Sequence, residues 1–246
     1  MSRAKPAPTV AELPAIGFAL PRITPAARSR AARLMAALRA QYPDAHCELV
    51  ASSPHELLVA TILSAQATDV SVNKATPALF ARFPTPAEFA AASPEAIEPF
   101  IKTIGLYRNK AKAIHAAMTT LVTAFGGEVP QSMEELLTLR GVARKTANVV
   151  LGNSFKINVG FVVDTHIERL AKRFALVPMD ANVQKVERTL MALFDRRDWC
   201  DLSHMLIFHG RRACKARVPG GCAGCAARPA ACNSICKEFG MRCELR

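Results

Sequence analysis

The sequence predicts an all-α protein, and three observations support this fold class. Helix-start signals recur from Arg30 onward. Apolar residues then follow at helical spacing, as in the run after Thr165. No alternating strand pattern persists anywhere in the chain. We therefore expect many short helices, without a repeat at solenoid spacing.

Capping signals locate individual helices. Ser53-Pro54-His55-Glu56 reads as a capping box with proline at the first helical position, followed by an apolar face from Leu57. Further starts are predicted at Ser93-Pro94, at Ser132-x-x-Glu135 and at Thr165-x-x-Glu168. A helix beginning near Asn109 should end at Gly126-Gly127, because glycine is common just beyond a helix C-terminus.

The length and the net charge of the chain limit its number of domains and indicate the kind of partner it binds. The 246 residues can form one large domain or two small ones, and half of them are apolar. The net charge of +12 favours an anionic partner, either nucleic acid or a membrane surface. No apolar run reaches the roughly 18 residues of a membrane span, and no secretory signal is visible. We expect a cytoplasmic protein. Residues 1–27 are predicted to be a disordered basic tail, with a transit peptide as the alternative.

The stretch "LRGVARKTANVV" at 139–150 predicts two helices joined by a tight turn. Glu134–Leu139 should form the first helix, Gly141 should break it, and an apolar helix should open at Lys145. Such a hairpin aims backbone N–H groups at one point, where phosphate can bind. The alternative is a plain helical corner with solvated charges, because turn motifs alone are weak evidence.

Six of the eight cysteines lie in the last 33 residues, which favours a metal site over a disulfide scaffold. The pattern is Cys214-x7-Cys222-x2-Cys225-x6-Cys232, and Cys236 and Cys243 follow it. Four thiolates suit a [4Fe–4S] cluster, but they also suit tetrahedral zinc. The spacing alone does not separate these metals.

Several motifs together resemble the helix–hairpin–helix DNA glycosylases, and most closely the endonuclease III family. They are "LLVATILSAQATDVSVNKAT" (57–76), "IKTIGLYRNKAKAI" (101–114), "LRGVARKTANVV" and "VVDTH" (162–166). The resemblance spans roughly positions 30–235. It implies a two-domain helix–hairpin–helix fold with a C-terminal [4Fe–4S] loop. The six-helix domain would cover 47–158, and the cluster domain would combine 28–46 with 159–246.

The resemblance implies a monomeric bifunctional DNA glycosylase and AP lyase that removes oxidised pyrimidines from double-stranded DNA. Lys145 would be the nucleophile and Asp164 the catalytic carboxylate. A neutral lysine amine can attack C1′, displace the base and form a Schiff base, after which β-elimination breaks the strand. Neighbouring cations such as Arg144 favour the neutral amine. Asp164 has a rival explanation, because it directly precedes a predicted helix start and could simply cap it.

Other roles also follow from the resemblance. Gln66 and Leu106 would fill the space left when the damaged nucleotide is flipped out of the duplex. Without the resemblance, they would read as a surface helix end and a core leucine. Residues expected to contact DNA are Gly141, Ala143, Arg144, His166, Lys215 and Arg217. The expected [4Fe–4S] ligands are Cys214, Cys222, Cys225 and Cys232, with Cys236 as the alternative fourth ligand.

The hairpin departs from the family pattern Leu-Pro-Gly-Val-Gly. Arg140 replaces the proline and Ala143 the second glycine. If position 143 adopts a positive φ or touches phosphate, alanine should weaken the grip on DNA. Three alternatives therefore stay open. They are a monofunctional mismatch glycosylase, a weakly active damage-binding protein with the same fold, and a basic zinc module that binds RNA.

Overall fold

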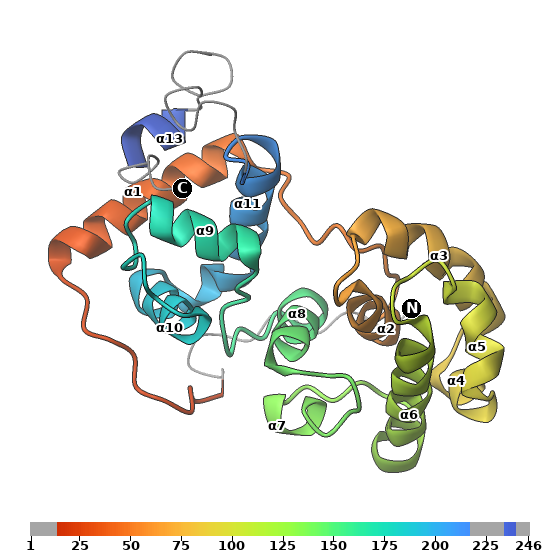
Figure 1. The fold of residues 1–246 in the computed structure, drawn as a ribbon. Helices are drawn as coiled ribbons and strands as arrows, with labels where there is room; N and C mark the ends of the chain where they lie inside the picture. Colours follow the sequence, from red (N-terminus) through yellow and green to blue (C-terminus); the bar gives the residue numbers. More distant parts are fainter. Residues whose placement is uncertain (1–13, 217–233, 240–246) are drawn as a thin grey trace. The chain divides into compact units, whose positions relative to one another are not determined.

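The computed structural model describes residues 14–216 and 234–239, and within them it contains helices and no strands (Figure 1). The predicted all-α class is confirmed. The chain divides into two compact units. The first consists of Cys47–Val159, and the second combines the described residues up to His46 with those from Gly160 onward. None of the described helices is long and apolar enough to span a membrane.

The first unit contains helices α2 to α8. Their bounds are α2 Pro54–Ser64, α3 Asp69–Arg82, α4 Pro86–Ala91, α5 Pro94–Ile101, α6 Tyr107–Phe125, α7 Met133–Leu136 and α8 Arg144–Phe155. The starts predicted at Ser53, Ser93 and Ser132 are confirmed, because each side chain accepts a hydrogen bond from a backbone N–H in the first helical turn. Gly126, with φ of 61°, ends α6 as predicted.

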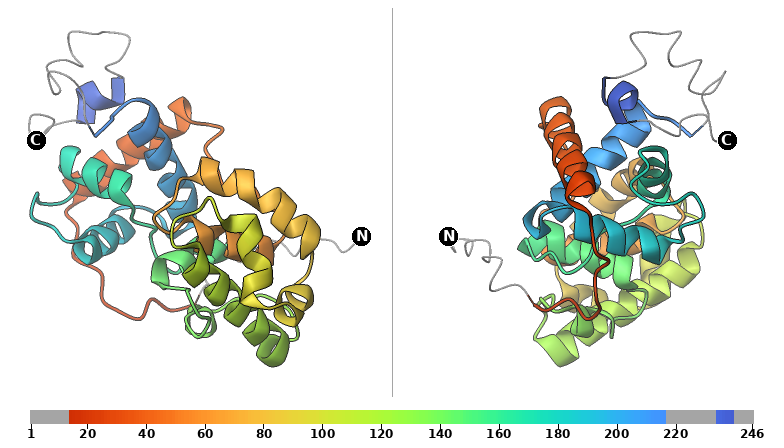
Figure 2. Two further views of the ribbon diagram at one scale, coloured as in Figure 1. Left: turned by 45° about the vertical axis from the view of Figure 1, so that its right-hand side comes forward. Right: turned by 90° about the vertical axis from the view of Figure 1, so that its left-hand side faces the viewer.

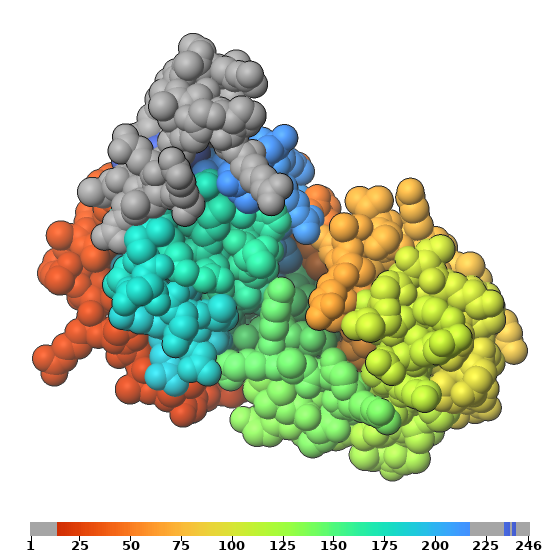
Figure 3. All heavy atoms as spheres, in the orientation of Figure 1, coloured from red at the N-terminus to blue at the C-terminus, as the bar shows by residue number. Residues whose placement is uncertain are grey.

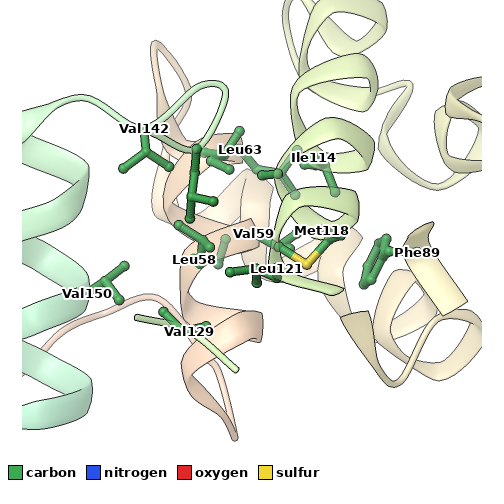
Figure 4. Packing of buried hydrophobic residues seen from close by; sticks show 14 of the residues in the cluster. Leu58, Val59, Leu63, Phe89, Ile114, Met118, Leu121, Val129, Val142 and Val150 are labelled. Carbon is green, nitrogen blue, oxygen red and sulfur yellow. The ribbon is translucent and has the colours of Figure 1, made fainter. Parts of the chain in front are cut away.

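Helix α2 is the centre of this unit. Every residue from Leu57 to Leu63 is buried. Leu58, Val59 and Leu63 pack against side chains of α6, such as Ile114 and Met118 (Figure 4). A helix that is apolar on all sides is stable only inside a core. The burial of α2 therefore holds its C-terminal end in place, and Gln66 is the residue that comes directly after the C-cap Ala65.

The second unit is built from α1 Pro25–Gln41, α9 Thr165–Arg173, α10 Val183–Leu193, the 3₁₀ turn η2 Arg196–Asp198, α11 Trp199–Arg212 and α13 Ser234–Phe239. Helix α1 lies beside α11, as the views in Figure 2 show. Trp199, Phe208 and Phe174 are fully buried among these helices. This unit therefore has its own hydrophobic core.

Three sequence predictions about local structure are wrong. The disordered tail does not extend to residue 27, because Ile16, Phe18 and Leu20 pack against the second core and Arg188 stacks on Phe18 at 4.6 Å. The helix predicted over 134–139 is the short α7, which starts at residue 133 and ends at Leu136. The cap of α9 is Asp164 and not Thr165.

Candidate functional site

The turn between α7 and α8 is fixed by close packing. Gly141 has φ of 84°, and a Cβ at this position would lie 3.0 Å from Cβ of Ala113. Leu139 and Val142, on either side of Gly141, are buried in the hydrophobic core of the first unit, where Figure 4 shows Val142. Arg140 and Ala143 are exposed. In the space-filling view, the region of the chain that contains this turn is drawn in green (Figure 3). The turn therefore exposes the Arg140 residue and its neighbouring backbone, while the buried residues beneath hold the turn in place.

We expect Gly141→Ala to lower the free energy of unfolding by about 2 kcal/mol, because it adds both left-handed strain and a contact with Ala113. Urea denaturation measures the change. Gly105→Ala is the matched control, since a Cβ there meets nothing within 4 Å. Equal stability of the two variants would show that the turn relaxes around the added methyl group.

The start of α8 carries the predicted nucleophile. Lys145 is the second residue of the helix, and its side chain is exposed. The N-cap residue is Ala143, which forms no side-chain capping bond. Its φ of −99° and ψ of 169° are ordinary extended values, so the expectation of a positive φ at this position is wrong. Alanine is therefore unstrained at this position. Because its side chain has no hydrogen-bond acceptor, Ala143 does not cap the backbone N–H groups in the first turn of α8.

Asp164 is the N-cap of α9. Its Oδ1 accepts a hydrogen bond from the backbone N–H of Ile167 at 2.8 Å. The carboxylate is partly buried at the positive end of the helix, where negative charge is stabilised. The capping role weighed from the sequence is therefore present. It occupies Oδ1 and fixes the orientation of the carboxylate, which a catalytic role also needs.

Gln66 and Leu106 both lie on the surface in strained backbone conformations. Leu106 is the N-cap of α6, with φ of 60°, and 60% of its surface is exposed. Gln66 follows the end of α2, with φ of 56°, and is exposed as well. Residues with a Cβ rarely adopt this left-handed conformation, and such outliers cluster at functional positions. The alternative of a core leucine at position 106 is wrong.

His166 contributes to the packing of α9 on α11. A Cβ at Gly210 would lie 2.9 Å from Cβ of His166, so the two helices approach each other closely at this glycine. Arg169 strengthens the contact, because it donates to the carbonyl oxygens of Gly210 and Cys214 at 3.1 and 2.9 Å. His166 is thus held in place by α11, and its predicted contact with DNA stays a prediction.

The loop after α11 is tied to α9 by Arg173, which donates to Sγ of Cys214 at 3.1 Å and to the carbonyl oxygen of Lys215 at 2.8 Å. The side chain of Lys215 is exposed. The other predicted residues of this region, Arg217, Cys222, Cys225 and Cys232, lie outside the described residues. The structure therefore locates the first predicted metal ligand and the basic residue next to it.

Cys214, Cys236 and His209 form a group of potential ligands, of which Cys214 and His209 are buried and Cys236 is partly buried. Their ligand atoms all lie within 4.8 Å of one another. Nε2 of His209 is 3.2 Å from Sγ of Cys236, and Nδ1 is hydrogen-bonded to the hydroxyl of Tyr42 at 3.0 Å. Burial lowers the pKa of His209 to about 4, so the ring is neutral near pH 7. A donor set of two sulfurs beside a neutral imidazole suits iron or zinc.

From the sequence, no role was assigned to Tyr42, His209 or Lys110. His209 belongs to the His209-Gly210-Arg211 stretch that precedes the C-terminal cysteines, but its sequence does not indicate a role beside the metal ligands. Tyr42 carries no local signal, because its contact with His209 joins α11 to the segment just after α1. Lys110 was also missed, although one sign was available. It occupies the apolar face of α6, four residues before Ile114, where a charged side chain is unexpected.

Comparison with known proteins defines the family. Residues 59–196 match the family model described as "HhH-GPD superfamily base excision DNA repair protein". The chain belongs to this superfamily of helix–hairpin–helix proteins.

Within the superfamily, the chain is similar to proteins named endonuclease III. It is 50% identical to that of Synechocystis sp. over 192 residues, which cover 78% of this chain and 87% of the relative. The Escherichia coli protein is 43% identical over 80% of this chain and 92% of its own length.

Two solved structures have the same fold. One is a trapped covalent intermediate of endonuclease III with DNA, an estranged-adenine complex, with a TM-score of 0.74, 42% identity and coverage of 80% of this chain and 91% of that chain. The other is a non-covalent endonuclease III–DNA complex, with a TM-score of 0.76, 40% identity and coverage of 88% and 99%.

Proposed function

We propose that this protein is a bifunctional DNA glycosylase and AP lyase that excises oxidised pyrimidines from double-stranded DNA. The observation that carries the proposal is the exposed Lys145 at the start of α8, directly after the rigid turn, in a chain of this superfamily. The relative captured in a covalent complex with DNA supports a covalent route. A monofunctional mismatch glycosylase would not need this lysine.

In the proposed reaction, the amine of Lys145 attacks C1′ of the flipped nucleotide as the bond from C1′ to the base breaks. The base leaves with the bonding electrons and gains a proton. The carboxylate of Asp164 stabilises the positive charge that develops on the sugar. The attached nitrogen loses a proton, and its lone pair then expels the ring oxygen O4′ from C1′; O4′ gains a proton, and the opened sugar carries a protonated Schiff base to Nζ. This Schiff base acidifies the 2′ hydrogen, and loss of that proton drives a β-elimination that breaks the C3′–O3′ bond and releases the 3′ phosphate.

Incubation with sodium borohydride tests this route, because borohydride reduces a Schiff base to a stable amine that joins protein and DNA. We expect the wild-type protein to form a covalent adduct with duplex DNA that contains an oxidised pyrimidine. Base release without an adduct or strand cleavage would favour a monofunctional glycosylase. Binding without base release would favour a damage-binding protein.

We propose that the C-terminal cysteines hold a [4Fe–4S] cluster, with Cys214, Cys222 and Cys225 as ligands. The burial of Cys214 and the hydrogen bond from Arg173 to its sulfur fit a thiolate ligand, since a cation stabilises negative charge on sulfur. The role of the cluster would be structural. It would hold the loop that carries Lys215 and Arg217 close to DNA phosphates.

Cys236 is the candidate for the fourth ligand, because its sulfur lies within 4.8 Å of Sγ of Cys214. The alternative, Cys232, lies outside the described residues. We expect Cys236→Ala to lose most of its bound iron and its visible absorbance, and Cys232→Ala to keep both. Iron analysis of the two purified variants decides between them. The reverse pattern would restore Cys232 as the ligand, and zinc in the wild-type protein would exclude the cluster.

A further inference from the structure

Lys110 is a buried lysine whose ammonium group binds the end of another helix. The residue is only 6% exposed. Nζ donates to the carbonyl oxygens of Leu63 at 2.8 Å and Ala65 at 2.6 Å. These carbonyls belong to the last turn and the C-cap of α2, where backbone acceptors lack partners within the helix and carry partial negative charge. The ammonium therefore satisfies the C-terminal end of α2.

The same residue is part of the start of α6. Its backbone N–H donates to the carbonyl oxygen of Leu106 at 3.0 Å and closes the first turn of this helix. On the other side, Gln66 directly follows the Ala65 carbonyl that the ammonium binds. Lys110 thus links the two exposed residues proposed to enter the DNA duplex, through its side chain to one and through its backbone to the other.

Burying an ammonium group is costly unless strong hydrogen bonds compensate for the lost water. Burial lowers the pKa of Lys110, which reflects this cost. An apolar side chain would fill this position of α6 without that cost. The lysine provides what an apolar residue does not, which is a fixed position for the backbone leading into Gln66.

Gln66 and Leu106 both need such support. Both adopt the left-handed backbone conformation, at φ of 56° and 60°, which is unfavourable for residues with a Cβ and persists where surrounding contacts hold it. Side chains that replace a flipped nucleotide must also be held in position before DNA arrives, because ordering them during binding would cost entropy.

We propose that Lys110 is a positioning residue for nucleotide flipping, which holds Gln66 and Leu106 together so that both can fill the space left in the duplex. This inference rests on the proposed function. It assigns to Lys110 no contact with DNA and no step in the chemistry at Lys145.

The test compares two substrates that differ in their need for flipping. The first is duplex DNA with an oxidised pyrimidine, followed by single-turnover base release. The second is single-stranded DNA with an abasic site, followed by borohydride trapping, where no partner strand has to be stabilised. We expect Lys110→Met to slow base release from the duplex about tenfold and to change single-strand trapping less than about twofold.

Lys112→Met is the matched control. Lys112 lies two residues further along α6, is exposed, and carries the same charge. It should change neither reaction by more than about twofold, because exposed charges are well screened. If Lys110 served only to stabilise the fold, Lys110→Met would reduce both reactions in the same proportion, and the proposal would be wrong.

A double-mutant cycle tests whether Lys110 acts through the two surface residues. In the Gln66→Ala, Leu106→Ala background, we expect Lys110→Met to slow the duplex reaction by less than about twofold, because the side chains it positions are already gone. A further tenfold loss in this background would show an independent role and overturn the proposal.

Lys110→Arg provides a second variant if the methionine variant does not fold. Arginine keeps the charge and the N–H donors on a larger, planar head group. We expect a loss smaller than that of Lys110→Met and confined to the duplex substrate, and an equal loss on both substrates would contradict the proposal. A wild-type protein that traps no abasic DNA would refute the proposed function itself, whereas equal losses on both substrates would refute only the role of Lys110.

Discussion

Lys145→Gln should abolish the borohydride-trapped adduct while the protein still binds DNA. Glutamine has no nucleophilic amine, so the Schiff base cannot form. Lys145 is exposed at the second position of α8, so its removal leaves the packing of the hairpin intact. Trapping should therefore fall below detection, and binding to DNA with an abasic site should fall only by the contribution of one exposed charge.

Lys156→Gln is the control for this prediction. Lys156 is also exposed and lies at the C-cap of the same helix, so it removes the same charge from α8. This variant should trap DNA like the wild type. An undiminished adduct in Lys145→Gln would assign the nucleophile to another amine. Loss of DNA binding together with loss of the adduct would show a general role in binding.

Asp164→Asn should slow base release by about a hundredfold, because it removes the negative charge that stabilises the developing positive charge on the sugar. The structure makes this substitution informative. Asparagine is as good an N-cap as aspartate, so the hydrogen bond from Ile167 can be kept. The melting temperature of Asp164→Asn should therefore stay close to that of the wild type.

Asp164→Ala separates the two roles further. It removes both the charge and the cap, so it should slow base release similarly and also lower stability by about 1 kcal/mol. Single-turnover rates and thermal melting of both variants provide the measurements. Wild-type rates in Asp164→Asn, combined with a destabilised Asp164→Ala, would show that Asp164 only caps α9.

The sequence predicted best those features that depend on residues close together in the chain. Ser53, Ser93 and Ser132 cap helices as predicted, because each cap depends on residues only three positions away. The error at Thr165 has the same origin. Asp164 and Thr165 are both good capping residues, and the sequence does not say which of two neighbours adopts the extended conformation before the helix.

Features that depend on tertiary contacts were less predictable. The segment after residue 13 looked like a basic tail, yet its apolar residues pack against the second core. At Ala143, the expectation of a positive φ came from the glycine of the family pattern, whereas the left-handed glycine of the turn is Gly141. The proposed role of Lys110 depends on α2 and α6 lying side by side, which no local pattern reveals.

The exposure of Leu106 also required the structure. Its neighbours indicated a tight loop, but a leucine is more often buried than exposed. The left-handed conformation of Leu106 at the start of α6 explains how the side chain remains on the surface. Motif resemblance identified Gln66 and Leu106, and the structure adds the backbone geometry that supports their proposed role.

Peptide mapping of the borohydride-reduced adduct is the most direct test of the account. Wild-type protein is trapped on DNA that contains an oxidised pyrimidine, the DNA and the protein are digested, and the modified peptide is sequenced by mass spectrometry. We expect the sugar remnant on the side-chain nitrogen of Lys145. A remnant on any other amine, or base release without a covalent adduct, would contradict the proposed mechanism.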